Sequence, residues 1–304
     1  MQEAVNLVER YGSAAYASKA CGIPDATIRH RYEKACVAGV RPTVEREEPK
    51  PYVQERLGRV HMVIPDIQAK PDVPHDHLRW IANYALDKRP DVIVQIGDWA
   101  DMPSLSLYDK GKRCYEGRRY VKDVDAANTS LDIFEKTIED YNRTGGKPYN
   151  PRKVLTFGNH EHRIYRATML DASLDGKLSI NDLDFARRGW ECHDFLEVVK
   201  IDEIQYSHYF ISGAMGRPVS SAAALLKARG GSATMGHVQR MDVAYHPQTQ
   251  QIGVFCGVCY QHNEDYLGPQ GNSCPRQILM KHEVENGRYD LMAVSLRFLQ
   301  KRYS

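Results

Sequence analysis

The chain has 304 residues, of which 41 are Lys or Arg and 39 are Asp or Glu, so its formal net charge is +2. This balance excludes a chain that is basic throughout, such as a histone, and an acidic disordered tail. Hydrophobic residues make up 42% and charged residues 26%, which is typical of a globular protein with one large domain or two unequal ones.

The sequence contains no recognisable membrane-spanning or secretory signal. No run approaches the roughly 20 apolar residues of a membrane helix. The opening residues lack a basic stretch followed by an apolar one, so we expect no secretory signal. Seven cysteines, an odd number without framework spacing, favour reduced thiols. We therefore expect a cytoplasmic protein with no membrane partner.

The first 40 residues predict three short helices. Residues 3–11 are amphipathic, Gly12 interrupts them, and Ser13 can cap a second helix that begins at residue 14. Residues 21–24 form a tight Gly- and Pro-containing connection, and residues 25–35 form the third helix. We assign residues 1–40 to a small helical domain.

The segment 11–35 resembles a helix-turn-helix of the Fis or resolvase-tail type. The resemblance implies that the third helix enters the major groove of DNA, where Arg29 and Arg31 reach phosphates or base edges. The alternative is a helical bundle that docks on the main domain or on a protein partner. That alternative stays open because residues 1–40 hold five basic and four acidic residues, a weak excess.

Residues 41–57 predict a linker, and residues 58–304 predict an α/β domain. The linker region is rich in prolines and charges and poor in apolar residues. Beyond it, strand patterns at 60–64, 91–96 and 153–157 alternate with helix patterns at 76–88 and 123–141. Such alternation predicts an α/β core with its functional loops at the strand ends.

Polar side chains follow the predicted strands. They are Asp66 and Gln68, Asp98 and Asp101, Asn159 and His160, then His208, and finally His237 and Gln239. Carboxylate and amide oxygens combined with imidazole nitrogens are suitable ligands for Mn, Fe or Zn, and one shared carboxylate can bridge two ions about 3.5–4 Å apart. The set therefore predicts a dinuclear metal site.

The same residues form recognisable blocks: GD-x-x-D at 97–101, GNHE at 158–161, His208, and GH at 236–237. In this order they resemble the calcineurin-like metallophosphoesterase family, over about residues 60 to 239. The resemblance implies a four-layer α/β/β/α sandwich and a hydrolase that cleaves phosphoester bonds.

The resemblance also implies roles for these residues. Asp98 would bridge the two ions, Asp66 would bind the first, and a bridging hydroxide would attack phosphorus in line. The remaining implied roles are Asn159, His208 and His237 as ligands of the second ion, His160 as general acid, and Asp101 as the residue that orients His160.

Two positions depart from the family pattern, because Gln68 and Gln239 stand where the family commonly has His. Both belong to the first metal site, and an amide oxygen is a weaker ligand than an imidazole nitrogen. We expect two divalent cations, one held more weakly, with Mn²⁺ favoured and Mg²⁺, Fe²⁺ or Zn²⁺ also suitable. The alternatives are that one ion suffices or that activity is lost.

A predicted insertion at about 102–150 contains a basic run. Residues 110–122 hold six basic residues and one acidic residue, with two tyrosines among them. Basic side chains with interleaved aromatic rings are typical of single-strand binding, although a solvated loop is equally consistent. The candidate phosphate-binding residues are Lys112, Arg113, Arg118 and Arg119, and also Arg163 after the GNHE block.

Together these features favour a phosphodiesterase or nuclease that acts on DNA. The first alternative is a phosphatase on a phosphoprotein or a small phosphoester. The second is a DNA-binding protein with a degenerate metal site. The sequence does not decide the oligomeric state.

Overall fold

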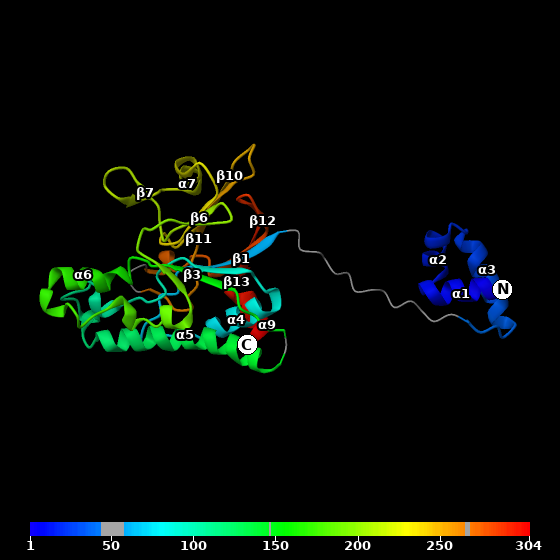
Figure 1. Ribbon diagram of the computed structural model, residues 1–304, viewed down its shortest axis with the longest axis horizontal. Coiled ribbons are helices and arrows are strands. Elements are labelled where there is room, and N and C mark those ends of the chain that lie inside the picture. Colours follow the sequence, from blue (N-terminus) through cyan, green and yellow to red (C-terminus); the bar gives the residue numbers. More distant parts are fainter. Residues whose placement is uncertain (44–57, 146, 265–267) are drawn as a thin grey trace. The chain divides into compact units, whose positions relative to one another are not determined.

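The computed structural model describes residues 1–43, 58–145, 147–264 and 268–304. The chain divides into two compact units, Met1–Glu55 and Arg56–Ser304, and each is described by itself (Figure 1). Most of the predicted linker, residues 44–57, lies outside the described residues.

The N-terminal unit consists of three helices, as expected: α1 (Gln2–Tyr11), α2 (Ala14–Cys21) and α3 (Asp25–Val37). Ser13 caps α2 by accepting a hydrogen bond from the backbone N–H of Tyr16. Gly22 ends α2 in the left-handed conformation that its lack of a Cβ permits. Ala17 and Ile28 are buried where the helices pack together.

Within the described residues, the second unit is built on two β-sheets and a short hairpin. The six-stranded sheet runs β13 (Arg288–Ser295), β12 (Gln277–Glu285), β1 (Arg59–Ile64), β2 (Val92–Gln95), β3 (Arg152–Thr156) and β4 (Glu191–His193). The five-stranded sheet runs β10 (Met241–Tyr245), β11 (Ile252–Cys256), β9 (Ala233–Met235), β6 (Ile204–Tyr206) and β5 (Val199–Ile201). A separate hairpin joins β7 (Ile211–Ser212) to β8 (Arg217–Pro218).

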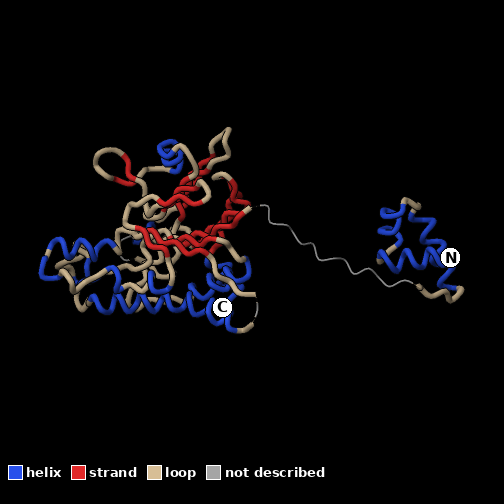
Figure 2. The backbone as a smooth tube through the Cα atoms, viewed as in Figure 1, coloured by secondary structure: helices blue, strands red, loops and turns tan. Residues whose placement is uncertain are grey.

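Helices cover the outer faces of these sheets (Figure 2). On the six-stranded sheet they are α4 (His77–Lys88), α5 (Tyr120–Arg143) and α9 (Leu296–Tyr303), and on the five-stranded sheet α7 (Ala222–Arg229). The other described helices are α6 (His162–Leu170) and α8 (Gly268–Gly271). Successive side chains of β1 point to opposite faces of the six-stranded sheet. Met62 packs against the helices α4, α5 and α9, whereas Val63 packs between the two sheets. A third cluster, which includes Leu225, joins α7 to the five-stranded sheet. The predicted α/β/β/α sandwich is thus confirmed.

The long helix α5 lies within the predicted insertion. It runs from Tyr120 to Arg143 and links the parallel strands β2 and β3. Parallel neighbours need such a crossover, so α5 belongs to the helical layer of the sandwich. The predicted insertion at about 102–150 thus includes this helix, and its bounds remain a prediction.

The parallel strands bring the predicted polar residues to one edge. β1, β2 and β3 run parallel to one another, and β6 and β9 form a parallel pair in the second sheet. Parallel strands end on the same side, so the loops after these strands meet there. In the part of the chain that the structure describes, no helix is long and apolar enough to cross a membrane.

A lysine is buried between the two sheets. Lys281 of β12 has no exposed surface, and its Nζ donates a hydrogen bond of 2.5 Å to Thr234 Oγ1. The Nζ atom lies 4.4 Å and 4.5 Å from the ring centroids of Tyr206 and Tyr289. Burial disfavours the ammonium form and lowers the pKa of Lys281 to about 7.

We expect Lys281→Met to raise stability near neutral pH and to reduce its pH dependence. The folded pKa of about 7 is below the unfolded value of about 10.4, so the unfolded chain binds more protons and stability rises with pH between these values. Between these pH values the unfolding free energy of the parent should rise by up to about 1.4 kcal/mol per pH unit because of this group, and that rise should be missing in the variant. Urea denaturation at several pH values measures the difference. Equal slopes would contradict it.

Candidate active site

Asp98 lies at the centre of the site, in the loop after β2. Only 2% of its surface is exposed, and Oδ1 accepts a hydrogen bond of 3.0 Å from the backbone N–H of His160. Oδ2 lies 3.4 Å from His208 Nε2 and 3.7 Å from His160 Nε2. Although burial opposes it, the positive charge on these imidazoles holds the pKa of Asp98 well below its usual range.

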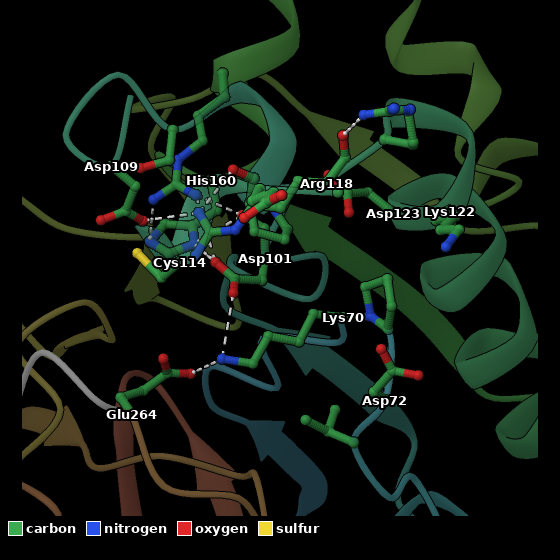
Figure 3. Close-up of a pocket in the computed structure, with 18 of the residues that line it drawn as sticks. Lys70, Asp72, Asp101, Asp109, Cys114, Arg118, Lys122, Asp123, His160 and Glu264 are labelled. Atoms are coloured by element: carbon green, nitrogen blue, oxygen red, sulfur yellow. Dashed lines mark hydrogen bonds and ion pairs between the residues drawn. The ribbon is translucent and has the colours of Figure 1, made fainter. Parts of the chain in front are cut away.

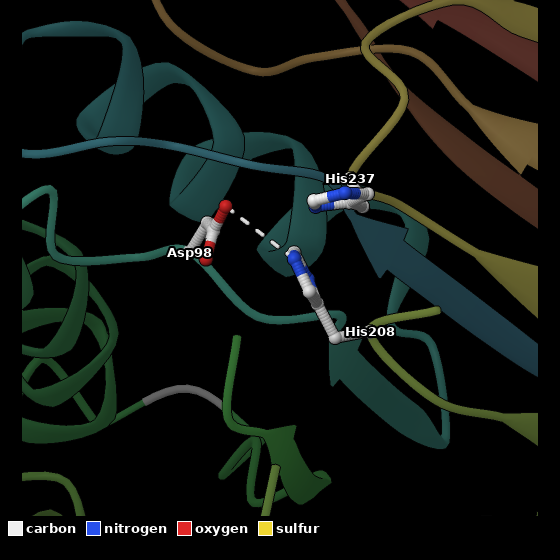
Figure 4. A group of neighbouring side chains, drawn as sticks. All are labelled: Asp98, His208 and His237. Atoms are coloured by element: carbon white, nitrogen blue, oxygen red, sulfur yellow. Dashed lines mark ion pairs between the residues drawn. The ribbon is translucent and has the colours of Figure 1, made fainter. Parts of the chain in front are cut away.

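Two imidazoles and an amide oxygen converge beside this carboxylate. Asn159 Oδ1 lies 2.9 Å from His208 Nε2 and 2.8 Å from His237 Nδ1. Within the described residues, Asp98, His208 and His237 form the one group of His, Cys or acidic side chains compact enough to hold a metal ion, with ligand atoms within 4.8 Å of one another (Figure 4). His208 Nδ1 lies 2.9 Å from the carbonyl of Ile96, which leaves Nε2 directed toward the centre.

Asp66 and Gln68, in the loop after β1, supply oxygens that have no partner. Asp66 Oδ2 and Gln68 Oε1 are both buried without a hydrogen bond. Burial, reinforced by the negative charge of Asp98, raises the pKa of Asp66 to about 7. A buried carboxylate beside another one is unfavourable unless a cation compensates them, so these donors fit the predicted metal pair.

The surroundings of His237 and His208 shift the pKa values of the two imidazoles in opposite directions. Burial lowers the pKa of His237 to about 4, which leaves a neutral nitrogen able to act as a ligand. Burial acts in the same direction on His208, but the charge of Asp98 and its contact with that carboxylate outweigh it and raise the pKa to about 9. A bound cation would displace the proton from His208.

The backbone of the predicted ligands is strained. Gln68, Asp98, His237 and Gln239 have φ values of 47°, 53°, 66° and 56°. This left-handed region is unfavourable for residues with a Cβ, and such residues concentrate at functional sites. The two glutamines differ in their hydrogen bonding. Among the residues that the structure describes, Gln68 Oε1 has no hydrogen-bond partner, whereas Gln239 Oε1 accepts from the hydroxyl of Tyr260 at 3.5 Å.

Two glycines allow the loops to approach the carboxylates. A Cβ at Gly158 would collide with Oδ1 of Asp98, and a Cβ at Gly236 would lie 2.5 Å from Oδ1 of Asp66. These contacts explain why glycine precedes both Asn159 and His237 in the blocks seen in the sequence.

His160 is held beside the centre by Asp101 and Arg163. Its Nδ1 lies 2.8 Å from Asp101 Oδ1, and its Nε2 lies 3.2 Å from Nη2 of Arg163. A guanidinium only donates, so Nε2 accepts from Arg163 and Nδ1 donates to Asp101. Burial opposes protonation, but the charge of Asp98 and the bond to Asp101 raise the pKa of His160. The structure thus places Asp101 in contact with His160, while the roles assigned to the two residues remain predictions.

Glu161 is a residue whose role the sequence reasoning missed. It is fully buried and accepts backbone hydrogen bonds from Asp98 (3.0 Å), Ala100 (2.8 Å) and Gly158 (2.8 Å). Its carboxylate therefore joins the loop after β2 to the loop after β3. The fourth letter of the GNHE block was the available signal, but its hydrogen-bond partners are backbone groups that a sequence pattern does not display.

A cavity of about 800 Å³ opens beside His160 (Figure 3). His160, Asp101 and Arg163 line it, whereas none of the seven predicted metal ligands does. Lys70 extends the polar network on its wall, with Nζ 2.6 Å from Glu264 Oε1 and 3.5 Å from Asp101 Oδ2. The cavity therefore meets the candidate metal centre on the side of His160.

Both basic and acidic side chains line this cavity, whereas the run at 110–122 in the sequence is mostly basic. Its basic lining residues are Lys70, Arg118, Arg119, Lys122 and Arg163, and its acidic ones are Asp72, Asp101, Asp109, Glu116, Asp123 and Glu264. Asp109 forms ion pairs with Arg118 at 2.9 Å and with Lys112 at 3.3 Å. Carboxylates from the same loop and from distant segments thus offset the basic run.

The predicted phosphate-binding residues are therefore divided. Arg118, Arg119 and Arg163 line the cavity, whereas Lys112 and Arg113 do not. Lys112 Nζ instead lies 3.3 Å from the ring centroid of Tyr108. Within the described part of the chain, Arg119 and Lys122 form no ion pair, so their charges remain available in the cavity.

The predicted DNA contacts lie on the other unit, on α3. Arg29 and Arg31 are both exposed, and Arg29 forms an ion pair of 2.8 Å with Asp25 one turn earlier. Such exposed pairs contribute little to stability, so Arg29 is free to exchange partners. The structure leaves both side chains accessible on the helix.

No protein-family profile matches the sequence, and no curated protein matches it significantly. Among solved structures, Vps29 from Entamoeba histolytica complexed with zinc aligns with a TM-score of 0.35 and 11% identity, covering 78% of this chain and 99% of that chain. Yfce, a phosphoesterase from E. coli, aligns with a TM-score of 0.31 and 10% identity, covering 78% of this chain and 100% of that chain. We transfer no residue role or activity across such distant similarities.

Proposed function

We propose that this chain is a calcineurin-like metallophosphoesterase that hydrolyses phosphodiesters, with DNA as substrate. The observation that supports this most is the meeting of five ligand-type residues from five strand-end loops beside His160. Asp66, buried beside Asp98, has a carboxylate oxygen without a hydrogen bond to any described residue and a raised pKa, as expected of a carboxylate that a cation would compensate. The proposed metal ligands are Asp66, Gln68, Asp98, Asn159, His208 and His237, with Gln239 at the margin.

Divalent cations, when bound, would supply an activated water and offset the negative charge on the phosphoryl oxygens. The chain's own residues would do the rest. The pKa of His160 is raised, so once Arg163 turns aside Nε2 would take up a proton from solvent. His160 would then donate that proton to the leaving oxygen, and Asp101 would keep the ring oriented through Nδ1. The cavity next to His160 would receive the leaving group, with Arg119 and Lys122 as phosphate contacts.

The N-terminal unit would add affinity for the DNA through Arg29 and Arg31. Exposed cations on a helix that follows a tight turn are the arrangement required for groove contacts. Phosphate contacts make binding fall with salt, so Arg29→Ala and Arg31→Ala should reduce the salt dependence of DNA binding.

A substrate comparison tests the proposal. Parent and Asp98→Asn would be assayed with Mn²⁺ on plasmid DNA, single-stranded DNA, a chromogenic diester and a chromogenic monoester. His246→Gln, in the turn between β10 and β11, is the matched control, because its ring accepts hydrogen bonds from Gln248 and Thr249 of that same turn. Diester cleavage that Asp98→Asn abolishes supports the proposal. Turnover of the monoester alone would indicate the phosphatase, and DNA binding without turnover would indicate a degenerate site.

We expect the two cations to bind with unequal affinity. Gln68 contributes a neutral oxygen and Gln239 shares its oxygen with Tyr260, while the other site has two imidazoles. Calorimetric titration with Mn²⁺ should show two steps separated by about tenfold or more, and Gln68→His should bring them closer. Two equal, tight steps in the parent would contradict the expectation.

A further inference from the structure

A row of aromatic rings leads away from the candidate metal ligands. Its members, called the aromatic wall from here on, are Tyr209, Phe195, His162 and Tyr165. The ring of Tyr209 lies 4.6 Å from that of His237, and the ring of Phe195 lies 5.6 Å from that of Tyr209. His162 follows at 4.7 Å from Phe195, and Tyr165 at 5.2 Å from His162.

The aromatic wall is not part of the protein core. The rings that pack beneath the six-stranded sheet, Trp99, Phe134, Phe185 and Trp190, are all at most 4% exposed. In the wall, Phe195 and Tyr209 are half-buried, and Tyr165 is 58% exposed. Met169, one turn after Tyr165 on the same face of α6, is 67% exposed and continues the row.

The wall and the cavity flank the first turn of α6 on different sides. His160 and Arg163 line the cavity, and no residue of the wall does. His162 instead turns to Phe195, which comes from the loop after β4. A phosphoester held between Asp98 and His237 would therefore have polar side chains on the side of His160 and aromatic side chains on the other side.

We propose that a base of a single-stranded nucleic acid stacks on the aromatic wall. This base would belong to the part of the substrate that retains the phosphate after cleavage. This inference rests on the proposed function. Every base has a π face and is flat enough to lie against an exposed ring such as that of Tyr165, whereas bases within a duplex are already stacked. Because the row begins at a ligand imidazole, a group bound there is connected to the phosphate at the metal centre. The wall thereby selects phosphodiesters that carry bases.

The test compares two ligands of equal backbone charge, a labelled oligothymidylate and the same strand with abasic residues. Binding to the full chain is followed by fluorescence anisotropy with chelator present, so that no cleavage occurs. We expect the parent to bind the base-bearing strand about tenfold more tightly. The double variant Tyr165→Leu and Phe195→Leu should reduce this preference to about twofold, with the affinity for the abasic strand unchanged.

Two single variants keep the test interpretable. Tyr165→Leu alone should lower the preference, because an exposed side chain can be replaced without unfolding the chain. Tyr245→Leu, a 62% exposed tyrosine on β10, is the matched control and should keep the preference of the parent. A parent without preference, or a double variant that keeps it, would overturn the inference. Absence of hydrolysis with Mn²⁺ would instead reject the phosphodiesterase and leave the binding preference standing.

Discussion

His160→Gln is expected to lower kcat on a phosphodiester by about 10²- to 10⁴-fold while the affinity for Mn²⁺ stays unchanged. The side chain lies next to the ligand set, with Nε2 3.7 Å from Asp98, but its bonds are to Asp101 and Arg163. Glutamine keeps a polar side chain of similar reach and cannot donate a proton as an acid. Calorimetry for the metal and steady-state kinetics for turnover separate the two effects.

The pH profile gives a second readout for the same variant. Because the pKa of His160 is raised, the protonated acid persists above the ordinary pH range of an imidazole. Activity of the parent should fall as pH rises through that pKa, and this descending limb should be missing in His160→Gln. His246→Gln should retain both the rate and the limb. A His160→Gln enzyme within threefold of the parent would exclude the residue as the acid.

Glu161→Ala is expected to cost about 3–5 kcal/mol of unfolding free energy. The carboxylate accepts three backbone hydrogen bonds in a fully buried position, and its removal leaves all three N–H groups without partners. The loops that carry Asp98 and Asn159 would separate, so Mn²⁺ affinity should fall as well. Urea denaturation and calorimetric titration measure the two effects.

A matched comparison distinguishes this role from a general effect of losing a charge. Glu139 on α5 is 51% exposed at its side chain and lies 3.7 Å from Arg188. Glu139→Ala should change stability by less than about 0.5 kcal/mol and leave metal affinity unchanged. If Glu161→Ala behaved like this control, the carboxylate would not hold the loops together.

The sequence predicted the fold class because two of its signals are local. The three parallel strands were confirmed within a residue or two of the predicted bounds, because β2 and most of β1 and β3 are buried and give short apolar runs in the sequence. The cap at Ser13 and the left-handed Gly22 depend only on neighbouring residues, so they too were predictable.

The candidate ligands were also visible in the sequence, because each follows a strand and parallel strands end at one edge. That rule brings Asp66, Asp98 and Asn159 together without any knowledge of distances. The roles assigned to these residues, and the contacts of Arg29 and Arg31 with DNA, remain predictions for the experiments above.

Only the tertiary structure decided the surroundings of the site. The basic run at 110–122 is opposed by carboxylates such as Asp72 and Glu264 from distant parts of the chain, so composition overestimated the positive charge of the cavity. Glu161 and the aromatic wall act through contacts between loops that lie far apart in the sequence. Local patterns report what a residue's neighbours in the chain require, whereas charge compensation and ring contacts depend on which segments the fold brings together.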